Sequence, residues 1–137
     1  MTKSILSVLL AVAACGGGDD GGGTPDAAGS GGGGSATCNV AATAMANTTN
    51  RTITGVGTVQ CDVTAGLSLN VCVQWNPDGT FKDIMCQSSN MSGVKDLRVE
   101  NVSSCGIATG RKFRTRVSAS VNSAAKPEVL SAEIGCE

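Results

Sequence analysis

The sequence predicts an all-β protein, an antiparallel sandwich of about seven strands that is braced by three disulfides and follows a disordered glycine-rich tether. Three observations lead to this fold class. Apolar and polar residues alternate through residues 36–137, turn-forming residues separate the alternating segments, and six cysteines form an even set within them. Seven half-buried strands in about 100 residues are typical of two packed sheets.

The N-terminal residues 1–14 have the features of a cleaved signal peptide. Lys3 supplies a positive charge, residues 5–14 form an apolar run, and small residues lead into Cys15. A ten-residue helix spans about 15 Å, whereas the hydrocarbon core of a bilayer is about 30 Å thick. We therefore expect this run to direct export rather than to cross a membrane.

The segment Val12-Ala13-Ala14-Cys15 resembles the lipobox of bacterial lipoproteins. The resemblance implies that the Cys15 thiol carries a diacylglycerol and that Cys15 becomes the first residue of the mature protein. Gly16, where an Asp often marks inner-membrane retention, implies an outer membrane or cell surface. We expect a lipid-anchored protein of the cell envelope, facing the periplasm or exterior. The alternative is an ordinary secretory signal that leaves Cys15 as a free or paired thiol.

Residues 15–35 are predicted to be a lipidated cysteine followed by a flexible linker. The segment is dominated by Gly, with Asp19 and Asp20 among them, and it has few apolar side chains. Ordering such a segment costs conformational entropy that no burial offsets. The folded domain should therefore be confined to residues 36–137.

Period-two alternation and turn residues predict seven strands in the domain, at 38–47, 51–64, 67–75, 80–87, 95–102, 111–122 and 129–136. The turn after Trp75 is the clearest, because Pro77 presets its own φ and Gly79 accepts a positive φ. The residues expected to face inward are Ile53, Gly55, Gly57, Val59, Cys61, Val63, Leu67, Leu69, Val71, Val73, Trp75, Leu97, Val99, Phe113, Thr115, Val117, Ala119, Val121, Leu130, Ala132, Ile134 and Cys136.

Register arguments favour sequential disulfides among the six domain cysteines. A hairpin that turns at residues 48–51 places Cys38 opposite Cys61. A second hairpin around the Pro77 turn places Cys72 directly or diagonally opposite Cys86. Cys105 and Cys136 remain to form the third pair. Zinc is the alternative use of these cysteines, but close Cys pairs and His are both absent, so we expect no metal and no cofactor.

The interval from Cys61 to Trp75 resembles the cysteine–tryptophan spacing of immunoglobulin-like and fibronectin-like sandwiches. The predicted strand 111–122 lacks the partner cysteine of that family, and the chain contains no Tyr for a tyrosine corner. The resemblance therefore implies an immunoglobulin-like architecture and carries no binding residues to this chain.

Charge excludes one class of partner and indicates one candidate surface. The net charge of −1 is unlike that of nucleic-acid-binding domains, so we expect no nucleic acid. Lys112, Arg114 and Arg116 project to one side of their strand, with Arg111 beside them. They form a candidate binding patch for anionic lipid, acidic glycan or an acidic protein. The alternative is a solvated strand face that blunts edge pairing.

The function expected from the sequence is a non-catalytic interaction or adhesion module that binds protein or glycan near the cell surface. No catalytic residues are assigned, because His is absent and no pairing can be argued for the Asp and Glu residues. One alternative is a small extracellular protease or enzyme inhibitor that presents a braced loop, at residues 76–80 or 122–128. A metal- or carboxylate-dependent hydrolase is a second alternative, and the oligomeric state stays open.

Overall fold

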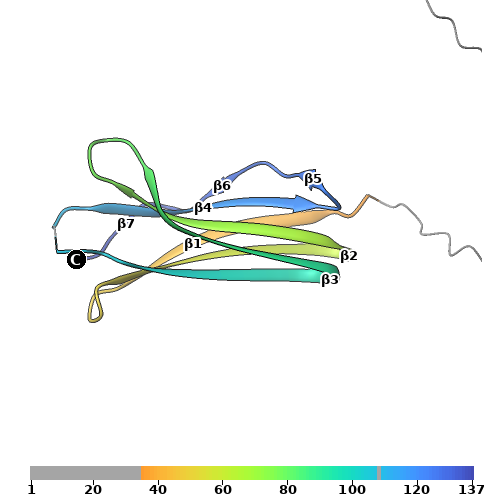
Figure 1. Ribbon diagram of the computed structural model, residues 1–137, viewed down its shortest axis with the longest axis horizontal. Coiled ribbons are helices and arrows are strands. Elements are labelled where there is room, and N and C mark those ends of the chain that lie inside the picture. The colour runs from red at the N-terminus through yellow and green to blue at the C-terminus, as the bar shows by residue number, and fades with distance from the viewer. Residues whose placement is uncertain (1–34, 108) are drawn as a thin grey trace, which may run out of the picture. The chain divides into compact units, whose positions relative to one another are not determined.

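The computed structural model describes residues 35–107 and 109–137, which form an antiparallel β-structure (Figure 1). This confirms the all-β fold class. In the described residues, no helix combines the length and apolar character needed to cross a bilayer. The signal peptide (1–14), Cys15 and all of the linker except Ser35 lie outside them. The strands are β1 (Cys38–Asn47), β2 (Thr52–Asn76), β3 (Lys82–Ser104), β4 (Lys112–Val121), β5 (Ala124–Ala125), β6 (Val129–Leu130) and β7 (Ile134–Gly135).

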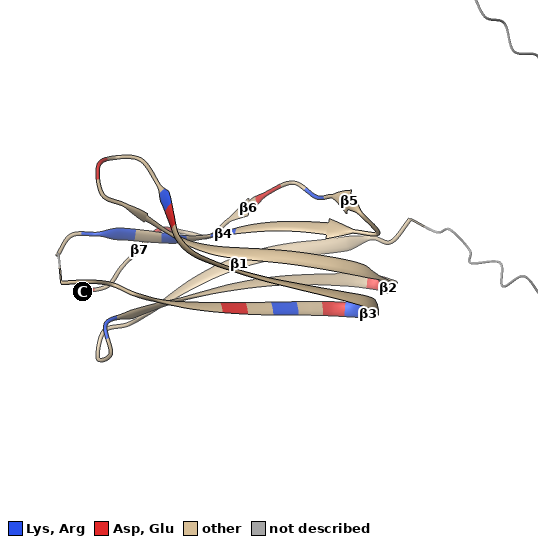
Figure 2. Cartoon of the chain, in the orientation of Figure 1, with Lys and Arg blue, Asp and Glu red and all other residues tan. Residues whose placement is uncertain are grey.

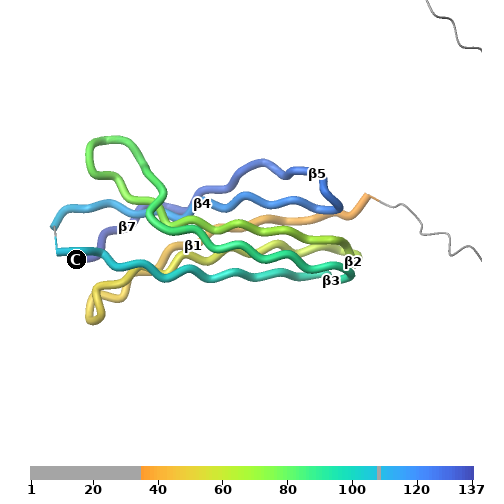
Figure 3. Tube along the Cα trace, viewed as in Figure 1, coloured from red at the N-terminus to blue at the C-terminus, as the bar shows by residue number. Residues whose placement is uncertain are grey.

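One continuous sheet makes the two layers of the sandwich by folding over on itself. β1 pairs with the first half of β2, β4 pairs with the second half, and β3 pairs with both halves. The register of β2 against β3 shifts between Gln60 and Ala65 and again before Leu67, where the two strands bend together. The layers are therefore β1 with residues 52–60 and 96–104, and β4 with residues 67–76 and 82–91 (Figure 3).

The β1–β2 hairpin has the predicted register. Cys38 lies opposite Cys61, and Val40 lies opposite Val59. The turn is closed locally, because Asn50 N donates to Asn47 Oδ1 at 3.0 Å and Arg51 takes a positive φ of 51°. A short polar turn thus fixes which faces of both strands point into the core.

The division into strands differs from the prediction in the middle of the chain. The expected strands 51–64 and 67–75 form the single strand β2, and 80–87 and 95–102 form the single strand β3. Bulges let the ladder continue through the bend instead of ending there. Val63, expected to face inward, falls within the register shift between Gln60 and Ala65 and is 46% exposed.

The predicted strand 129–136 is wrong as a continuous element. Only β6 and β7 pair with β4 in this stretch, and Leu130 is 44% exposed. Ser131 interrupts the ladder: its Oγ accepts from Thr115 N at 2.8 Å, while its own N donates to Thr115 O at 2.9 Å. A side-chain oxygen here replaces the backbone acceptor that a regular strand would supply.

Two clusters of aliphatic and aromatic side chains fill the space between the layers. The larger one contains Val59, Leu67, Leu69, Val71 and Val117, and the smaller one is built on Ile53, Val73 and Phe113. The layers approach closely at Gly57, where an added Cβ would come within 2.9 Å of Val117 Cγ2 and closer still to Val71 Cγ2.

Three disulfides join Cys38 to Cys61, Cys72 to Cys86, and Cys105 to Cys136. These are the pairs that the register arguments favour, and Cys72 lies directly opposite Cys86. The first two bridges connect neighbouring strands, whereas the third connects the end of β3 to the chain's C-terminal segment. The bridges therefore secure both ends of the domain.

Candidate functional site

Three connections gather at the end of the domain opposite residue 35: residues 48–51, 77–81 and 105–111 (Figure 1). We call this the loop end. Arg51 Nη2 donates to Gly106 O at 2.9 Å, and Cys105 N donates to Arg51 O at 2.9 Å. Gly110 N donates to the Glu137 carboxylate, and the Cys105–Cys136 bridge lies beneath. The loop end is therefore tied together by contacts between distant parts of the chain.

A cleft of about 380 Å³ opens at the loop end. Its walls include Trp75, Ile84 and Phe113, together with Asp83, Ser104, Gly106 and Arg111. The Arg111 guanidinium lies over the Trp75 ring, 4.4 Å from the centroid. Ile107 is 95% exposed beside Gly106. The cleft thus combines an aromatic wall with a cation, and the exposed apolar side chain of Ile107 follows the lining residue Gly106 in sequence.

The connection between β2 and β3 is rigid although it is exposed. Asn76 Oδ1 accepts from Gly79 N at 2.6 Å, and Asp78 Oδ1 accepts from Thr80 N at 3.3 Å. Lys82 Nζ lies 2.9 Å from Asp78 Oδ2. Gly79 has a φ of 92°, which confirms the positive φ expected of it.

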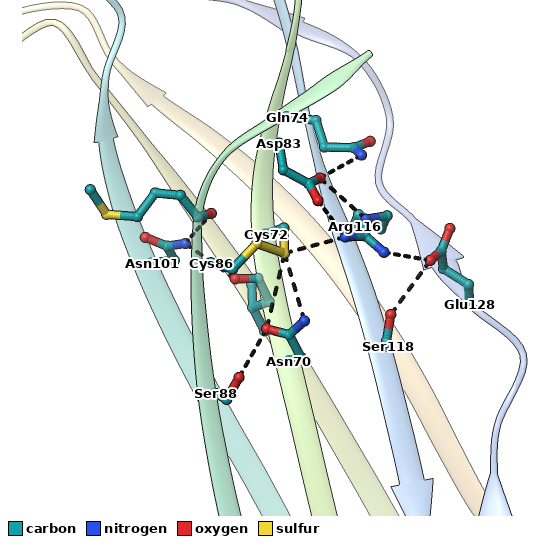
Figure 4. The surroundings of a disulfide bond; sticks show 12 residues. Asn70, Cys72, Gln74, Asp83, Cys86, Ser88, Asn101, Arg116, Ser118 and Glu128 are labelled. Carbon is teal, nitrogen blue, oxygen red and sulfur yellow. Dashed lines mark hydrogen bonds and ion pairs between the residues drawn. A yellow bond between two sulfur atoms is a disulfide. The ribbon is translucent and has the colours of Figure 1, made fainter.

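A polar network covers the outer face of β2 beside this connection (Figure 4). Arg116 Nη2 lies 2.5 Å from Asp83 Oδ2, and Arg116 Nη1 lies 2.9 Å from Glu128 Oε2. Gln74 Nε2 donates to Asp83 Oδ1 at 2.7 Å, and Gln74 Oε1 accepts from Arg114 Nε at 2.8 Å. The network links β2 and the start of β3 to β4 and to the segment before β6.

The network shifts the pKa values of its two central groups in opposite directions. Burial raises the pKa of Asp83, but hydrogen bonds from Arg116 and Gln74 outweigh it and hold the pKa below its usual value. Hydrogen bonds to Asp83 and Glu128 raise the pKa of Arg116. Both groups therefore stay charged when they are paired.

Acidification should weaken the fold through Asp83. A carboxylate whose pKa is lower in the folded protein contributes stability above its ordinary pKa of 3.8, and this contribution is lost as the pH falls through the folded value. Between about pH 6 and about pH 3, the free energy of unfolding measured with urea should fall less for Asp83→Asn than for the native chain. Asp96→Asn, an exposed change on β3, is the matched control. An equal loss in all three chains would contradict the prediction.

The four residues of the predicted basic patch lie together at the start of β4 and just before it, where Figure 2 shows Lys and Arg gathered. Phe113 and Thr115 point inward, so Lys112, Arg114 and Arg116 share the outer face as expected. Arg116 is committed to two carboxylates, and Arg114 lies over the Phe81 ring at 3.9 Å. Among the described residues, no carboxylate forms an ion pair with Arg111, Lys112 or Arg114. These three residues therefore carry the positive charge of the patch that is not neutralised by an ion pair.

Sequence reasoning missed the partners of these cations. The Trp75–Arg111 stack and the Asp83–Arg116–Glu128 contacts come from segments that are distant in sequence. The signal that could have found them is the register, because Arg116 lies opposite Cys72, while Gln74 lies opposite both Asp83 and Arg114. Pairing β2 with both β3 and β4 would have placed Asp83, Arg114 and Arg116 on one face.

Cys72, Asp83 and Cys86 bring ligand atoms within 4.8 Å of one another. Both sulfurs belong to one disulfide, so neither is available as the thiolate that a metal ion binds. In this oxidised form the cluster does not constitute a metal centre.

Comparisons with known proteins give little further information. No family model matches the chain, and no curated protein matches it. Among solved structures it is similar to R. palustris CsgH, known from a solution structure, with 13% identical residues and a TM-score of 0.42. The match covers 74% of this chain and 92% of the other. We draw no functional conclusion from so distant a likeness.

Proposed function

We propose that the chain is an envelope-anchored, non-catalytic interaction module that binds protein or glycan through its loop end. The observation that carries this is the cleft in which Arg111 stacks on Trp75, and the exposed Ile107 follows its lining residue Gly106 in sequence. Trp and Arg dominate the residues that contribute most to binding energy at interfaces. The contacts from Arg51 and the Cys105–Cys136 bridge hold this surface in place, so binding costs little further ordering.

The location of the cleft suits a tethered receptor or adhesin. The domain begins at Ser35, at the end opposite the loop end (Figure 1). If the chain is anchored through Cys15 and residues 16–35, the anchor joins the domain at one end and the cleft opens at the other. Three disulfides are typical of proteins that fold in oxidising compartments outside the cytoplasm. Both features support a lipid-anchored position in the cell envelope.

A non-catalytic role is favoured by the state of the groups nearest the cleft. The chain contains no His, and Asp83 is held as a charged partner of Arg116 and Gln74. A carboxylate with a lowered pKa is a poor general base at neutral pH, because it has little affinity for the proton it would remove. The cleft therefore suits recognition better than acid–base chemistry.

The test compares two matched charge insertions in the full chain. Ile107→Glu alters the loop end, and Val63→Glu alters an exposed apolar residue at the opposite end, by the bend of β2. Partners captured from an envelope extract or a glycan array are identified, purified and titrated against each chain. We expect Ile107→Glu to weaken saturable binding by about tenfold or more and Val63→Glu to leave it unchanged. Equal effects of both variants, or no saturable ligand, would overturn the proposal.

The rigid connection at 77–81 supports a second candidate, an inhibitor of an extracellular protease. Side-chain hydrogen bonds from Asn76 and Asp78 fix its shape, and the Cys72–Cys86 bridge joins the strands that flank it. A preorganised exposed loop is the feature by which such inhibitors bind. Incubation with a panel of proteases distinguishes the two outcomes: tight inhibition that Asn76→Ala weakens supports this candidate, and rapid cleavage within the loop contradicts it.

A further inference from the structure

The two cysteines of the Cys72–Cys86 bridge differ in exposure. Cys72 is 1% exposed on the central strand β2, whereas Cys86 is exposed on β3, which pairs with β2 alone. An external thiolate can reach Cys86 from solvent, and Cys72 is then the sulfur that leaves. The direction of thiol attack is therefore set by the fold.

The leaving sulfur has hydrogen-bond donors in place around it. Arg116 Nη2 lies 3.5 Å from Cys72 Sγ, and Asn70 Nδ2 lies 3.8 Å from it (Figure 4). Arg116 is fixed by Asp83 and Glu128, so its guanidinium need not reorganise when charge develops on sulfur. A nearby cation lowers the pKa of a thiol and makes it a better leaving group.

Asp83 opposes this effect, because its carboxylate lies within 4.8 Å of both sulfurs. The Asp83 carboxylate accepts hydrogen bonds from Arg116 Nη2 at 2.5 Å and from Gln74 Nε2 at 2.7 Å, which stabilise its negative charge. Gln74 contacts only Asp83, whereas Arg116 Nη2 contacts both Asp83 Oδ2 and the Cys72 sulfur. Arg116 is therefore the cation that lies against the sulfur on which the negative charge develops.

Contacts other than the disulfide hold the two strands together at this point. Asn101, 3% exposed, donates from Nδ2 to Val71 O at 3.1 Å and to Met85 O at 2.7 Å, the residues that precede the two cysteines. The bridge also spans 14 residues, against 23 and 31 for the others. The shortest loop contributes least to stability through chain entropy. The fold is thus arranged to persist when this bridge is open.

We propose that Cys72–Cys86 is a redox-active disulfide that exchanges with dithiols at the protein surface. A thiolate of the dithiol attacks Cys86 Sγ and forms a mixed disulfide. The Cys72–Cys86 bond breaks, and its electron pair goes to Cys72 Sγ beside Arg116. The second thiol of the dithiol, as its thiolate, then attacks the dithiol's own sulfur and releases Cys86. The dithiol is oxidised by two electrons, and the protein pair is reduced.

The test follows each bridge separately in the full chain. Protein is exposed to dithiothreitol for increasing times, quenched with acid and alkylated, and the opened cysteines are assigned by peptide mass spectrometry. We expect Cys72–Cys86 to open about tenfold or more faster than Cys38–Cys61, with the far-ultraviolet circular dichroism retained and the bridge restored by an oxidised dithiol. Opening no faster than Cys38–Cys61, or loss of the fold on opening, would overturn the proposal.

Substitution of Arg116 separates the cation's role from simple exposure of Cys86. Arg116→Gln should slow opening by about threefold or more, because the leaving sulfur loses its nearby cation, and should make the bridge harder to reduce at equilibrium. Arg116→Lys keeps the charge and should retain most of the rate. Arg98→Gln removes a more exposed cation that pairs with Glu100 on β3, away from the bridge, and should have no effect. If Arg116→Gln opens as fast as the native chain, the assignment of Arg116 is wrong.

Discussion

Phe113→Ala should lower the free energy of unfolding by about 3–5 kcal/mol, the largest single effect that we expect in this domain. Phe113 is 1% exposed and is the largest fully buried side chain in the described residues. It packs with Ile53 and Val73 in the smaller core cluster, and the chain has only two other aromatic residues. Urea unfolding followed by circular dichroism measures the change.

Phe81→Ala is the matched control for this substitution. Phe81 is half-buried beside Arg114, whose guanidinium lies 3.9 Å from the ring centroid. The expected loss is about 0.5–1 kcal/mol, the contribution of an exposed cation–π contact. If the two substitutions cost the same, Phe113 is not the anchor of the smaller cluster.

Gly57→Ala should cost about 1–3 kcal/mol although it adds a single methyl group. The new Cβ would lie between Val71 and Val117 of the opposite layer, within 2.9 Å of Val117 Cγ2. Both valines are fully buried, so neither has free space to move into. The layers must separate locally, and the surrounding side chains lose packing contacts. Urea or thermal unfolding measures the loss.

Gly135→Ala separates this crowding from the intrinsic effect of replacing glycine. No atom lies within 4 Å of the position that its Cβ would take, and it is also in a β-strand. The substitution should be neutral or slightly stabilising, because alanine restricts the unfolded chain. A loss at Gly135 as large as that at Gly57 would remove the steric explanation.

The sequence was most informative where its signals are local. Alternation correctly placed the inward faces of residues 67–75 and 111–122, and the polar turn at 48–51 fixed the register that sets Cys38 opposite Cys61. Both signals act over a few residues, and the disulfide pairs follow from them. Period-two patterns therefore predicted the fold class and its covalent framework.

The arrangement of the layers and the cleft was beyond this reasoning. Alternation does not reveal that β2 continues through a bend, because the bulges near Ala65 change the side-chain phase without ending the ladder. The cleft joins Trp75 to Arg111 across a pairing between β2 and β4 that no local pattern specifies. Arg116 looked like one of four equivalent cations, although Asp83 and Glu128 neutralise it.

The point where the chain enters the domain determines how the protein responds to mechanical force. The first ladder pair of β1, Cys38 with Cys61, is covalent, and just outside it Thr37 N donates to Asp62 Oδ1 at 2.9 Å while Asp62 N donates to Thr37 O at 3.0 Å. Tension applied through the preceding residues acts on this disulfide and these two hydrogen bonds before it reaches the rest of the hairpin. β1 cannot be peeled away one hydrogen bond at a time, and the load passes into β2, which runs through both layers.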